Sequence, residues 1–533
     1  MNVPADRPGA GTVPDTGAPV VPEPPTPAAQ TDRVVFGVAA AAVAAIVVWG
    51  LTATDNFGSV TGAILEWIVD ELGWLFVITA SGFVFFALWL AVSRYGRIPL
   101  GKDGEQPEFR TVSWISMMFA AGMGIGLMFF GVAEPLSHYV DPPPGTNGGT
   151  GVAMATSMFH WSLHPWSIYA VVGLAIAYGT FRKGRRQLIS SAFVPLLGRR
   201  SEGPLGKAID ILALFATLFG TAASLGLGAL QIGSGFEVNG WIESVGVMLL
   251  VAIVALLTLA FIASAVTGVA KGIQWLSNIN MVLAAALALF VFVLGPTVFI
   301  LNLVPTTLGA YAAEFARMSA RTAASSEAAG EWLSSWTIFY WAWWVSWAPF
   351  VGMFLARISR GRTIREFVVG VILVPSMVSL VWFSTFGGAG IGQQIDGLDV
   401  ADADSVEGQL FGVLGHLPLT GIATTVAMLL IAIFFVSGAD SASMVMGTLS
   451  QRGTLAPRRA VVVFWGALTG GVAALLLWSG GAEALNALQT MTIIAAAPFV
   501  VVMIGLCVSL YRDLQRDPMI TGGRRKRTLR RVA

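Results

Sequence analysis

The feature that most limits how this sequence can fold is a series of long stretches without Asp, Glu, Lys or Arg. Twelve of them lie at 34–54, 72–93, 111–133, 142–181, 211–236, 244–270, 272–313, 332–356, 367–395, 408–439, 460–482 and 484–511. Each reaches the roughly 20 residues that a helix needs to cross about 30 Å of hydrocarbon. A chain built this way is predicted to be an integral membrane protein with twelve membrane-spanning segments.

Composition and pattern predict that these segments are helices. Charged residues make up 11% of the chain and hydrophobic residues 55%, whereas soluble proteins carry about 25% charge. Leu, Ala, Val and Phe run continuously, without the alternating ten-residue pattern of membrane strands. The predicted class is therefore all-α. The three longest stretches need not be helical throughout, because Asp141 to Gly145 and Pro305 to Gly309 are typical of loops or surface turns.

The distribution of basic residues predicts the orientation. With the N-terminus inside, all but two of the 31 Lys and Arg residues fall in the tails and connections on the cytoplasmic side, the exceptions being Arg317 and Arg321. Basic residues favour the cytoplasmic side of a membrane. The opposite side is acidic, with Asp55, Glu66 and the segment 396–407. We therefore expect both termini in the cytoplasm of a bacterial-type inner (plasma) membrane.

The two ends of the chain differ from its apolar body, predicted over 33–515. Residues 1–32 are rich in Pro, Ala, Gly and Thr, which predicts a disordered tail. A signal peptide is not expected, because the first apolar run begins only at Val34. The short basic tail 516–533 has six cations between Arg524 and Arg531. The tail is expected to contact anionic lipid, with about 1 kcal/mol of stabilisation for each basic residue near the surface. The alternative is that these residues only keep positive charge on the cytoplasmic side.

Two counts exclude other kinds of partner and site. The single cysteine, Cys507, excludes a disulfide framework and a cysteine metal site. A net charge of +1 argues against a nucleic-acid partner. The sequence lacks the phosphate-binding motif G-x-x-x-x-G-K-[ST], so ATP is not expected to be the energy source.

Three alternating glycines mark one unusual span. Gly122, Gly124 and Gly126 lie in the middle of 111–133, and each costs about 1 kcal/mol relative to Ala in a helix. Gly122 and Gly126 could serve close helix packing, but the alternation exceeds what one packed face needs. We predict that this helix unwinds in the membrane and offers backbone groups to a ligand.

Tryptophans mark a second unusual span. Trp343, Trp344 and Trp347 lie mid-span in 332–356, whereas interfacial tryptophans occupy helix ends; their spacing puts Trp347 on a face with the other two. A further aromatic group, beside Pro165 as a predicted kink, consists of Trp161, Trp166 and Tyr169. Several aromatic faces around one cavity would cage a quaternary ammonium. Apolar packing is the alternative, but a buried Trp needs a partner for its N–H group.

Other polar groups inside the spans are few. Asp440 follows an apolar run, and intramembrane carboxylates are usually functional, although this one could lie at the cytoplasmic edge. His160 and His164 have the spacing of metal ligands but no accompanying Glu or Cys, so hydrogen-bonded structure is expected. Thr217 and Thr221 place two hydroxyls on one helix face, with hydrogen bonding to preceding carbonyls as the alternative role.

Three segments together resemble the betaine/choline/carnitine transporter family, closest to its sodium-coupled glycine betaine branch. They are Met117 to Pro135 (MMFAAGMGIGLMFFGVAEP), His160 to Tyr169 (HWSLHPWSIY) and Trp341 to Gly361 (WAWWVSWAPFVGMFLARISRG). The resemblance runs from about residue 34 to 515, and the Trp-rich block alone is close to diagnostic. It implies two inverted five-helix repeats of LeuT type, about 111–302 and 332–511, after two extra helices. It also implies a homotrimer.

The resemblance also implies the ligands of each site. The aromatic box would consist of Trp161, Trp166, Tyr169 and Trp344, with Trp347 as the main cation–π contact and Trp343 nearby. The substrate carboxylate would meet backbone groups along Ala121, Gly122, Gly124 and Gly126, and Ser224 would line the same pocket. One sodium would bind carbonyls of Ala120 and Met123 and the hydroxyl of Ser437; a second would bind Thr217, Thr221 and Phe350.

Two departures from the family pattern leave questions open. The sodium-coupled pattern has two adjacent hydroxyl residues where this chain has Ser437 and Gly438. One ligand is missing, so the affinity for the ion or its identity is open. The tail after Arg512 is short compared with osmosensing members, so osmotic activation is also open.

The expected function is sodium-coupled uptake of glycine betaine or a similar zwitterionic compatible solute by alternating access, with no catalytic residue and no cofactor besides the coupling ion. The alternative is a proton- or sodium-coupled carrier for choline, ectoine, proline or carnitine, with Asp440 as a proton or gating residue. A channel would need a polar lining along several helices, and a sensor would need a sizeable soluble domain. Neither feature is present in the sequence.

Overall fold

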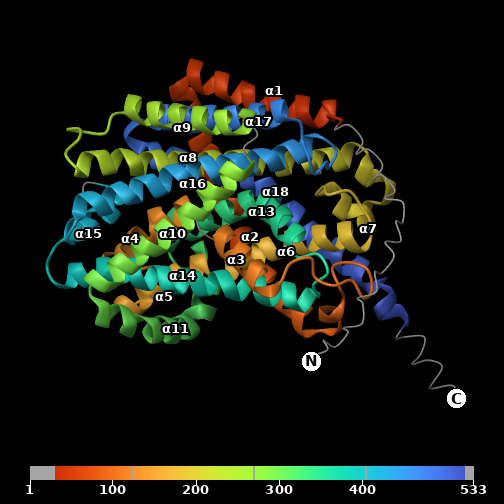
Figure 1. The fold of residues 1–533 in the computed structure, drawn as a ribbon, viewed down its shortest axis with the longest axis horizontal. Coiled ribbons are helices and arrows are strands. Elements are labelled where there is room, and N and C mark those ends of the chain that lie inside the picture. The colour runs from red at the N-terminus through yellow and green to blue at the C-terminus, as the bar shows by residue number, and fades with distance from the viewer. Residues whose placement is uncertain (1–29, 123, 268–269, 403–404, 523–533) are drawn as a thin grey trace, which may run out of the picture.

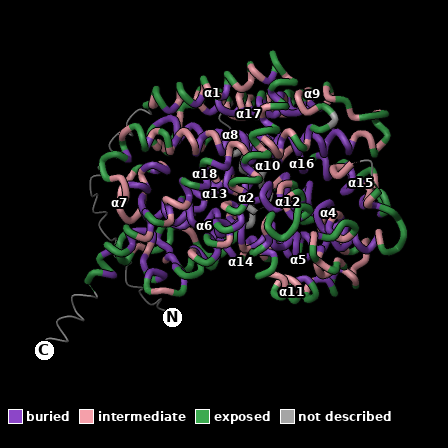
Figure 2. Tube along the Cα trace, turned by 180° about the vertical axis from the view of Figure 1, so that it is seen from behind, coloured by how far each residue is buried: buried purple, intermediate pink, exposed green. Residues whose placement is uncertain are grey.

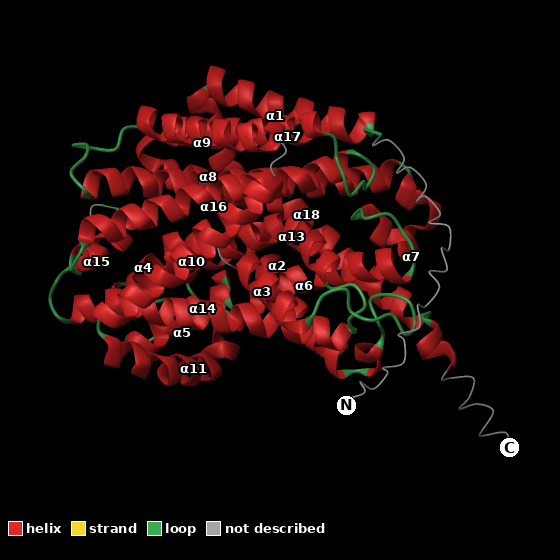
Figure 3. Ribbon diagram, viewed as in Figure 1, coloured by secondary structure: helices red, strands yellow, loops and turns green. Residues whose placement is uncertain are grey.

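The computed structural model describes residues 30–122, 124–267, 270–402 and 405–522. Helices make up most of this part of the chain, and it contains no β-strand (Figure 3). A single isolated bridge pairs Pro99 with Thr363. The predicted all-α class is confirmed. The predicted N-terminal tail lies largely outside the described residues, as do Arg524 to Arg531.

Eighteen α-helices follow one another along this part of the chain (Figure 1). They are α1 (Arg33–Thr52), α2 (Thr54–Val92), α3 (Thr111–Gly122), α4 (Ile125–Val140), α5 (Thr150–Trp161), α6 (Leu163–Ala177), α7 (Val194–Leu197), α8 (Pro204–Val238), α9 (Val247–Thr267), α10 (Ala270–Leu294), α11 (Thr297–Ala320), α12 (Glu327–Leu333), α13 (Phe339–Ile358), α14 (Ile364–Ile395), α15 (Gln409–Gly415), α16 (Thr420–Ser450), α17 (Arg459–Gly480) and α18 (Ala484–Gln515). A π-helical turn, η6 (Ser334–Ile338), joins α12 to α13.

Ten helical segments in the described chain are long and apolar enough to cross a membrane. This count differs from the twelve predicted spans because two of those spans, 111–133 and 142–181, are each divided between two shorter helices. The apolar part of α10, Asn278–Leu294, is also short. Helix α11 is instead long and apolar enough to cross a membrane, although most of it was predicted only as the end of the stretch 272–313.

Both predicted interruptions are present. Helix α3 ends at Gly122 and α4 begins at Ile125, with Gly124 fully extended at φ −172° and ψ −176°. The second interruption separates α5 from α6 at Ser162, where φ is −120° and ψ is −108°. Pro165 lies in the first turn of α6, where its missing N–H group is tolerated. The predicted loop from Asp141 to Gly145 is also observed.

Two other loop predictions are wrong. The predicted turn from Pro305 to Gly309 lies inside α11, because a proline removes only one hydrogen bond from an otherwise helical run. The acidic segment 55–71, predicted as an outer loop, forms the first half of the 39-residue helix α2. Its acidic side chains are exposed, and Asp55 lies in the first helical turn, where a negative charge is favourable.

Helix α13 forms the centre of the molecule and packs against α6, α8 and α18. In Figure 1 helices α1, α9 and α17 form one side of the body and α5 and α11 the opposite side. Figure 2 shows buried residues concentrated between these two sides. The crossing of α6 and α13 is close, because a Cβ on Gly352 would lie 2.7 Å from Val172 and 3.1 Å from the backbone nitrogen of Gly173. Small residues at such crossings let the helix backbones approach.

The chain after α18 is tied by hydrogen bonds to the π-helical turn η2 (Tyr178–Arg182), which follows α6. Arg182 Nε donates to Asp517 Oδ2 at 2.6 Å, and the Tyr178 hydroxyl donates to the same oxygen at 2.8 Å. Burial alone would raise the pKa of Asp517, but these hydrogen bonds, with that from the backbone of Met519, hold it below its usual value.

Candidate functional site

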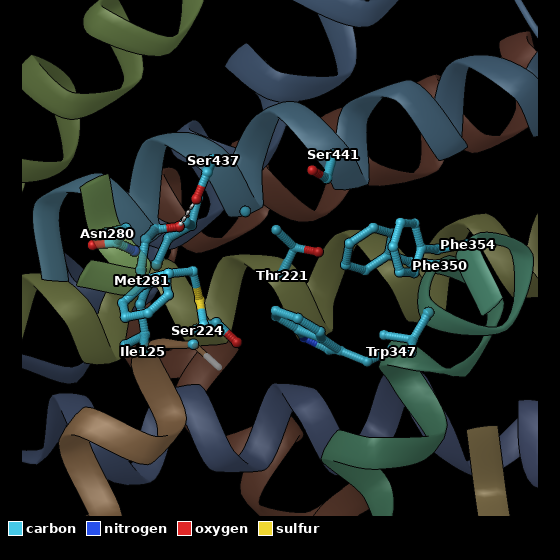
Figure 4. Close-up of a pocket in the computed structure, with 15 residues that line it drawn as sticks. Ile125, Thr221, Ser224, Asn280, Met281, Trp347, Phe350, Phe354, Ser437 and Ser441 are labelled. Atoms are coloured by element: carbon cyan, nitrogen blue, oxygen red, sulfur yellow. Dashed lines mark hydrogen bonds between the residues drawn. The ribbon is translucent and has the colours of Figure 1, made fainter. Parts of the chain in front are cut away.

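Two neighbouring cavities lie where the interrupted helices meet α8 and α13. The larger, about 220 Å³, is bounded by residues of α8, α10, α13 and α16 and by the start of α4 (Figure 4). The smaller, about 50 Å³, is lined mainly by aromatic side chains. Gly124, Ile125, Ser224 and Trp347 line both. Trp347 therefore lies between the two spaces.

The predicted aromatic residues come together around the smaller cavity. Its lining includes Trp161, Trp166, Tyr169, Trp343, Trp344 and Trp347. Three neighbouring pairs stand nearly perpendicular: Trp161 and Trp344 at 85° with centroids 4.9 Å apart, Tyr169 and Trp344 at 87° and 5.8 Å, and Trp166 and Tyr169 at 77° and 5.4 Å. Trp343 and Trp344 are instead stacked, at 17° and 5.5 Å. The rings around the cavity therefore have several different orientations.

Hydrogen bonds to the indole N–H groups hold three of these rings. Trp161 Nε1 donates to Glu134 Oε2 at 2.6 Å, and Trp343 Nε1 donates to Ser224 Oγ at 3.0 Å. Trp344 Nε1 donates to the carbonyl of His160 at 2.9 Å. Trp347 Nε1 is buried and has no partner within the described chain, so its N–H group is available to a ligand.

The glycines at the α3–α4 interruption have different surroundings. A Cβ on Gly126 would lie 2.6 Å from Trp343 Cη2 and 2.8 Å from Trp161 Cη2. Gly126 is therefore required by the rings packed on it. Gly124 has nothing within 4 Å of such a Cβ and borders both cavities. Met123 lies outside the described residues, as do the side chains of Ala120 and Ala121 and the surroundings of Gly122, although α3 continues through Gly122.

Three predicted sodium ligands, Thr221, Phe350 and Ser437, border the larger cavity, together with Gly438, the position of the missing ligand. The Thr221 hydroxyl donates to the carbonyl of Thr217 at 2.7 Å, and the Ser437 hydroxyl to that of Phe434 at 3.3 Å. Such bonds use the hydroxyl hydrogen and leave the oxygen lone pairs free to accept. Thr217 is fully buried one turn before Thr221 and is not among the residues lining this cavity.

Two carboxylates do not lie where the sequence suggested: Asp440, predicted as functional, is away from both cavities, and Glu134, which was not predicted, contacts an aromatic residue of the smaller one. Asp440 is half-buried within α16, ten residues before its end, and lines neither cavity. Glu134, which the sequence analysis did not single out, is fully buried in α4 and contacts Trp161. Because the uncharged stretches were bounded by charged residues, Glu134 ended the span 111–133 and was not considered part of the membrane interior. Its position directly after the glycine-rich motif was the signal that could have identified it.

The two histidines of α5 and α6 have separate roles. His160 Nδ1 lies 2.6 Å from Glu134 Oε1, so the expectation that no Glu accompanies the histidines is wrong: the Glu comes from a neighbouring helix. His164 Nε2 lies 3.3 Å from Ser81 Oγ, and its ring stacks on Trp341 at 4.9 Å. His160 and His164 therefore contact different partners.

Comparison with known proteins gives one consistent result. The model of the betaine/carnitine/choline transporter family matches residues 34–519. The betaine/ectoine transporter LcoP of Corynebacterium glutamicum is 45% identical over 91% of this chain and 78% of its own length. The glycine betaine transporter OpuD of Bacillus subtilis is 46% identical, over 91% and 94%. Glycine betaine transporter 1 of Vibrio parahaemolyticus is 40% identical, over 91% and 94%.

The surroundings of Gly126 generate a prediction about the aromatic cavity. Gly126→Ala should force the Trp161 and Trp343 rings apart and destabilise the protein by about 1–3 kcal/mol, the usual effect of overpacking. Thermal unfolding in detergent, followed by tryptophan emission, measures this. Gly124→Ala is the matched control, because its Cβ meets nothing and extended backbone accepts any residue. Equal melting temperatures for the two variants would contradict the packing described above.

Proposed function

The chain belongs to the betaine/carnitine/choline family of transporters, and from this premise we propose that it takes up glycine betaine or a similar zwitterion by sodium-coupled symport. The observation that carries the proposal is the convergence of six aromatic side chains on one buried cavity. A quaternary ammonium cannot donate hydrogen bonds, and the negative faces of aromatic rings attract it. The names of the relatives LcoP and OpuD, which include betaine, agree with this substrate class.

A zwitterion fits the polar surroundings better than choline does. No acidic or basic side chain is among the described residues that line either cavity. Choline, with a net positive charge, would need a carboxylate nearby, whereas betaine brings its own. The free N–H group of Trp347 and the backbone at Gly124 offer hydrogen-bond donors for that carboxylate. Ectoine, proline, carnitine and choline are the alternative substrates that uptake assays would separate.

Ion coupling supplies the driving force that a neutral substrate lacks. Each cation moved with the substrate contributes about 2.3 kcal/mol per 100 mV of membrane potential. Two cations would supply roughly 4.6 kcal/mol, which corresponds to about a 2,000-fold concentration ratio. We propose two sodium ions per substrate. Alternating access would then expose the shared site to one side of the membrane at a time.

Oxygen atoms around the larger cavity suit sodium, a hard cation. We propose one site at Thr217, Thr221 and the carbonyl of Phe350. Pro349 lacks the N–H group that would otherwise bind the carbonyl of Val345, so the backbone there is partly freed. The other site would join Ser437 to carbonyls of Ala120 and Met123. It is weakened by Gly438, which supplies no side-chain oxygen.

The remaining architecture of the transporter is also a proposal. We place both termini in the cytoplasm of a bacterial-type inner membrane, from the distribution of Lys and Arg. We further propose two inverted repeats, about 111–302 and 332–511, in a homotrimer whose basic C-terminal tail contacts anionic lipid.

Removing the central ring tests the aromatic cavity. Trp347→Leu keeps the position apolar, with a smaller side chain, and removes the ring face. Since a desolvated cation–π contact is worth about 2 kcal/mol, betaine affinity should fall about 30-fold. Binding to purified protein measures this. Trp478→Leu is the control, because Trp478 is 47% exposed on the outer surface. Unchanged binding in Trp347→Leu would show that the cage is assigned wrongly.

Competition tests the substrate class. Uptake of labelled glycine betaine into proteoliposomes should be inhibited more strongly by unlabelled betaine than by choline at the same concentration. The reason is that no carboxylate faces the cavity to balance choline's charge. The reverse order would favour a choline carrier, and saturable, concentrative uptake would also exclude a channel and a sensor.

Hydroxyl variants test the coupling ion. Thr221→Ala and Ser437→Ala should raise the sodium concentration for half-maximal uptake, whereas Gly438→Ser should lower it. The added side chain has room, because a Cβ on Gly438 meets nothing within 4 Å. Thr425→Ala is the control: this exposed threonine of α16 makes the same hydrogen bond to a preceding carbonyl, at 2.6 Å. Uptake that ignores sodium and collapses with a proton uncoupler would reject sodium coupling and make Asp440 the first candidate for carrying the proton.

A further inference from the structure

A cluster of three buried titratable side chains lies outside both cavities. Glu134 and His138 are one turn apart on α4, and His160 comes from the last turn of α5. All three are completely buried. One carboxylate oxygen and one nitrogen from each ring lie within 4.8 Å of one another. This is a convergence of potential metal ligands from two helices.

His138 is the anomaly in this cluster. Neither of its ring nitrogens has a hydrogen-bond partner in the described chain, although burying an unpaired polar group is unfavourable. Its Nε2 lies 3.5 Å from Glu134 Oε1, which in turn lies 2.6 Å from His160 Nδ1. Ligands about 2.0–2.1 Å from a tetrahedral zinc ion are about 3.4 Å apart. The first of these separations already matches that spacing, and Glu134 and His160 would have to move apart by about 0.8 Å to match it.

An ionised Glu134 would also need a cation nearby. A carboxylate inside a membrane needs a partner, and Glu134 forms no ion pair with a Lys or Arg among the described residues. The guanidinium of Arg321 lies instead over the ring of Trp332, 4.9 Å from its centroid. His138 lies in the last turn of α4, where the helix dipole favours positive charge.

Hydrogen bonds from neighbouring residues fix the orientation of His160 and Glu134, as the ligands of a metal site require. His160 Nε2 lies 2.9 Å from Thr337 Oγ1, and Trp161 Nε1 donates to Glu134 Oε2 at 2.6 Å. A metal on His160 Nδ1 would leave the proton on Nε2, which would then donate to Thr337. Metal-binding histidines and carboxylates characteristically have such outer hydrogen bonds, which fix tautomer and orientation.

We propose that Glu134, His138 and His160 form a binding site for a divalent transition-metal ion of the zinc class, with water as a fourth ligand. Imidazole and carboxylate together favour such ions over sodium, magnesium or calcium. The site borders the aromatic cavity, because Glu134 holds the Trp161 N–H group and the carbonyl of His160 holds that of Trp344. An ion there fixes two walls of that cavity. Zinc is thus expected to inhibit uptake, a consequence that rests on the proposed function.

Metal binding can be measured apart from transport. The full chain, purified with a histidine-free tag, is titrated with cobalt(II), whose tetrahedral complexes absorb visible light, and then with competing zinc. His138→Gln removes a direct ligand and should weaken binding by more than about 100-fold, beyond the roughly 10–100-fold range of an outer-shell change. His164→Gln is the matched control, a buried histidine that contacts Ser81 instead. Equal affinity in these two variants, or no binding by the wild-type chain, would overturn the proposal.

A second variant and a second readout cover the other outcomes. If His138→Gln does not fold, Thr337→Val removes only the outer hydrogen bond and should weaken zinc binding about 10-fold; an unchanged affinity would count against the site. Zinc should inhibit betaine uptake by the wild type and by His164→Gln, but not by His138→Gln. Inhibition that persists in His138→Gln would overturn the link to the aromatic cavity. A chain that bound zinc but took up no betaine would reject the proposed function and leave the metal site in place.

Discussion

The constraint on which this structure depends is that backbone N–H and C=O groups inside a membrane must find partners within protein. Uninterrupted helices meet it automatically, and most of the chain takes that form. The two interruptions, at Gly122–Ile125 and at Ser162, are exceptions that the fold surrounds with other helices. Irregular backbone is tolerated at this depth only where protein or a cavity encloses it. Both cavities lie beside Gly124, so the departure from regular helix and the candidate site are one feature.

The same rule governs the tryptophans. An indole carries an N–H group that has to be satisfied when it is buried, and the chain supplies a carboxylate, a hydroxyl and a backbone carbonyl for Trp161, Trp343 and Trp344. These bonds lie at the ring edges and do not use the ring faces. The polar interior therefore determines the orientation of the apolar walls. Trp347 is the exception among these four, and it is the ring between the two cavities.

The features that were predicted correctly depend on neighbours in sequence. Uncharged runs predict helices, and alternating glycines predict where one ends, because both effects act within a turn or two. Spacing also identified the six aromatic residues of the smaller cavity, although what they bind stays a prediction. The errors came from local rules applied too strictly. Exposed acidic residues were compatible with α2, and Pro305 with α11.

Contacts between helices could not be predicted from one sequence. The spacing of Glu134 and His138, four positions apart on one helix, places those two side by side, but nothing in the sequence indicates that His160, 22 positions beyond His138, also faces Glu134. That arrangement follows from how α4 packs on α5. Ending each span at a charged residue also excluded Glu134, a carboxylate that is completely buried. Which hydroxyls border the larger cavity, and that Thr217 does not, likewise depends on helix rotation.

The four residues that line both cavities have a thermodynamic consequence. Gly124, Ile125, Ser224 and Trp347 are walls of both spaces, so a ligand in one changes the shape that the other presents. Binding at the two cavities is then linked, and linkage is reciprocal. If a ligand in the larger cavity strengthens binding in the smaller cavity by some factor, a ligand in the smaller cavity strengthens binding in the larger one by the same factor. Two ligands that do not touch each other can thus affect each other's binding through the residues that line both cavities.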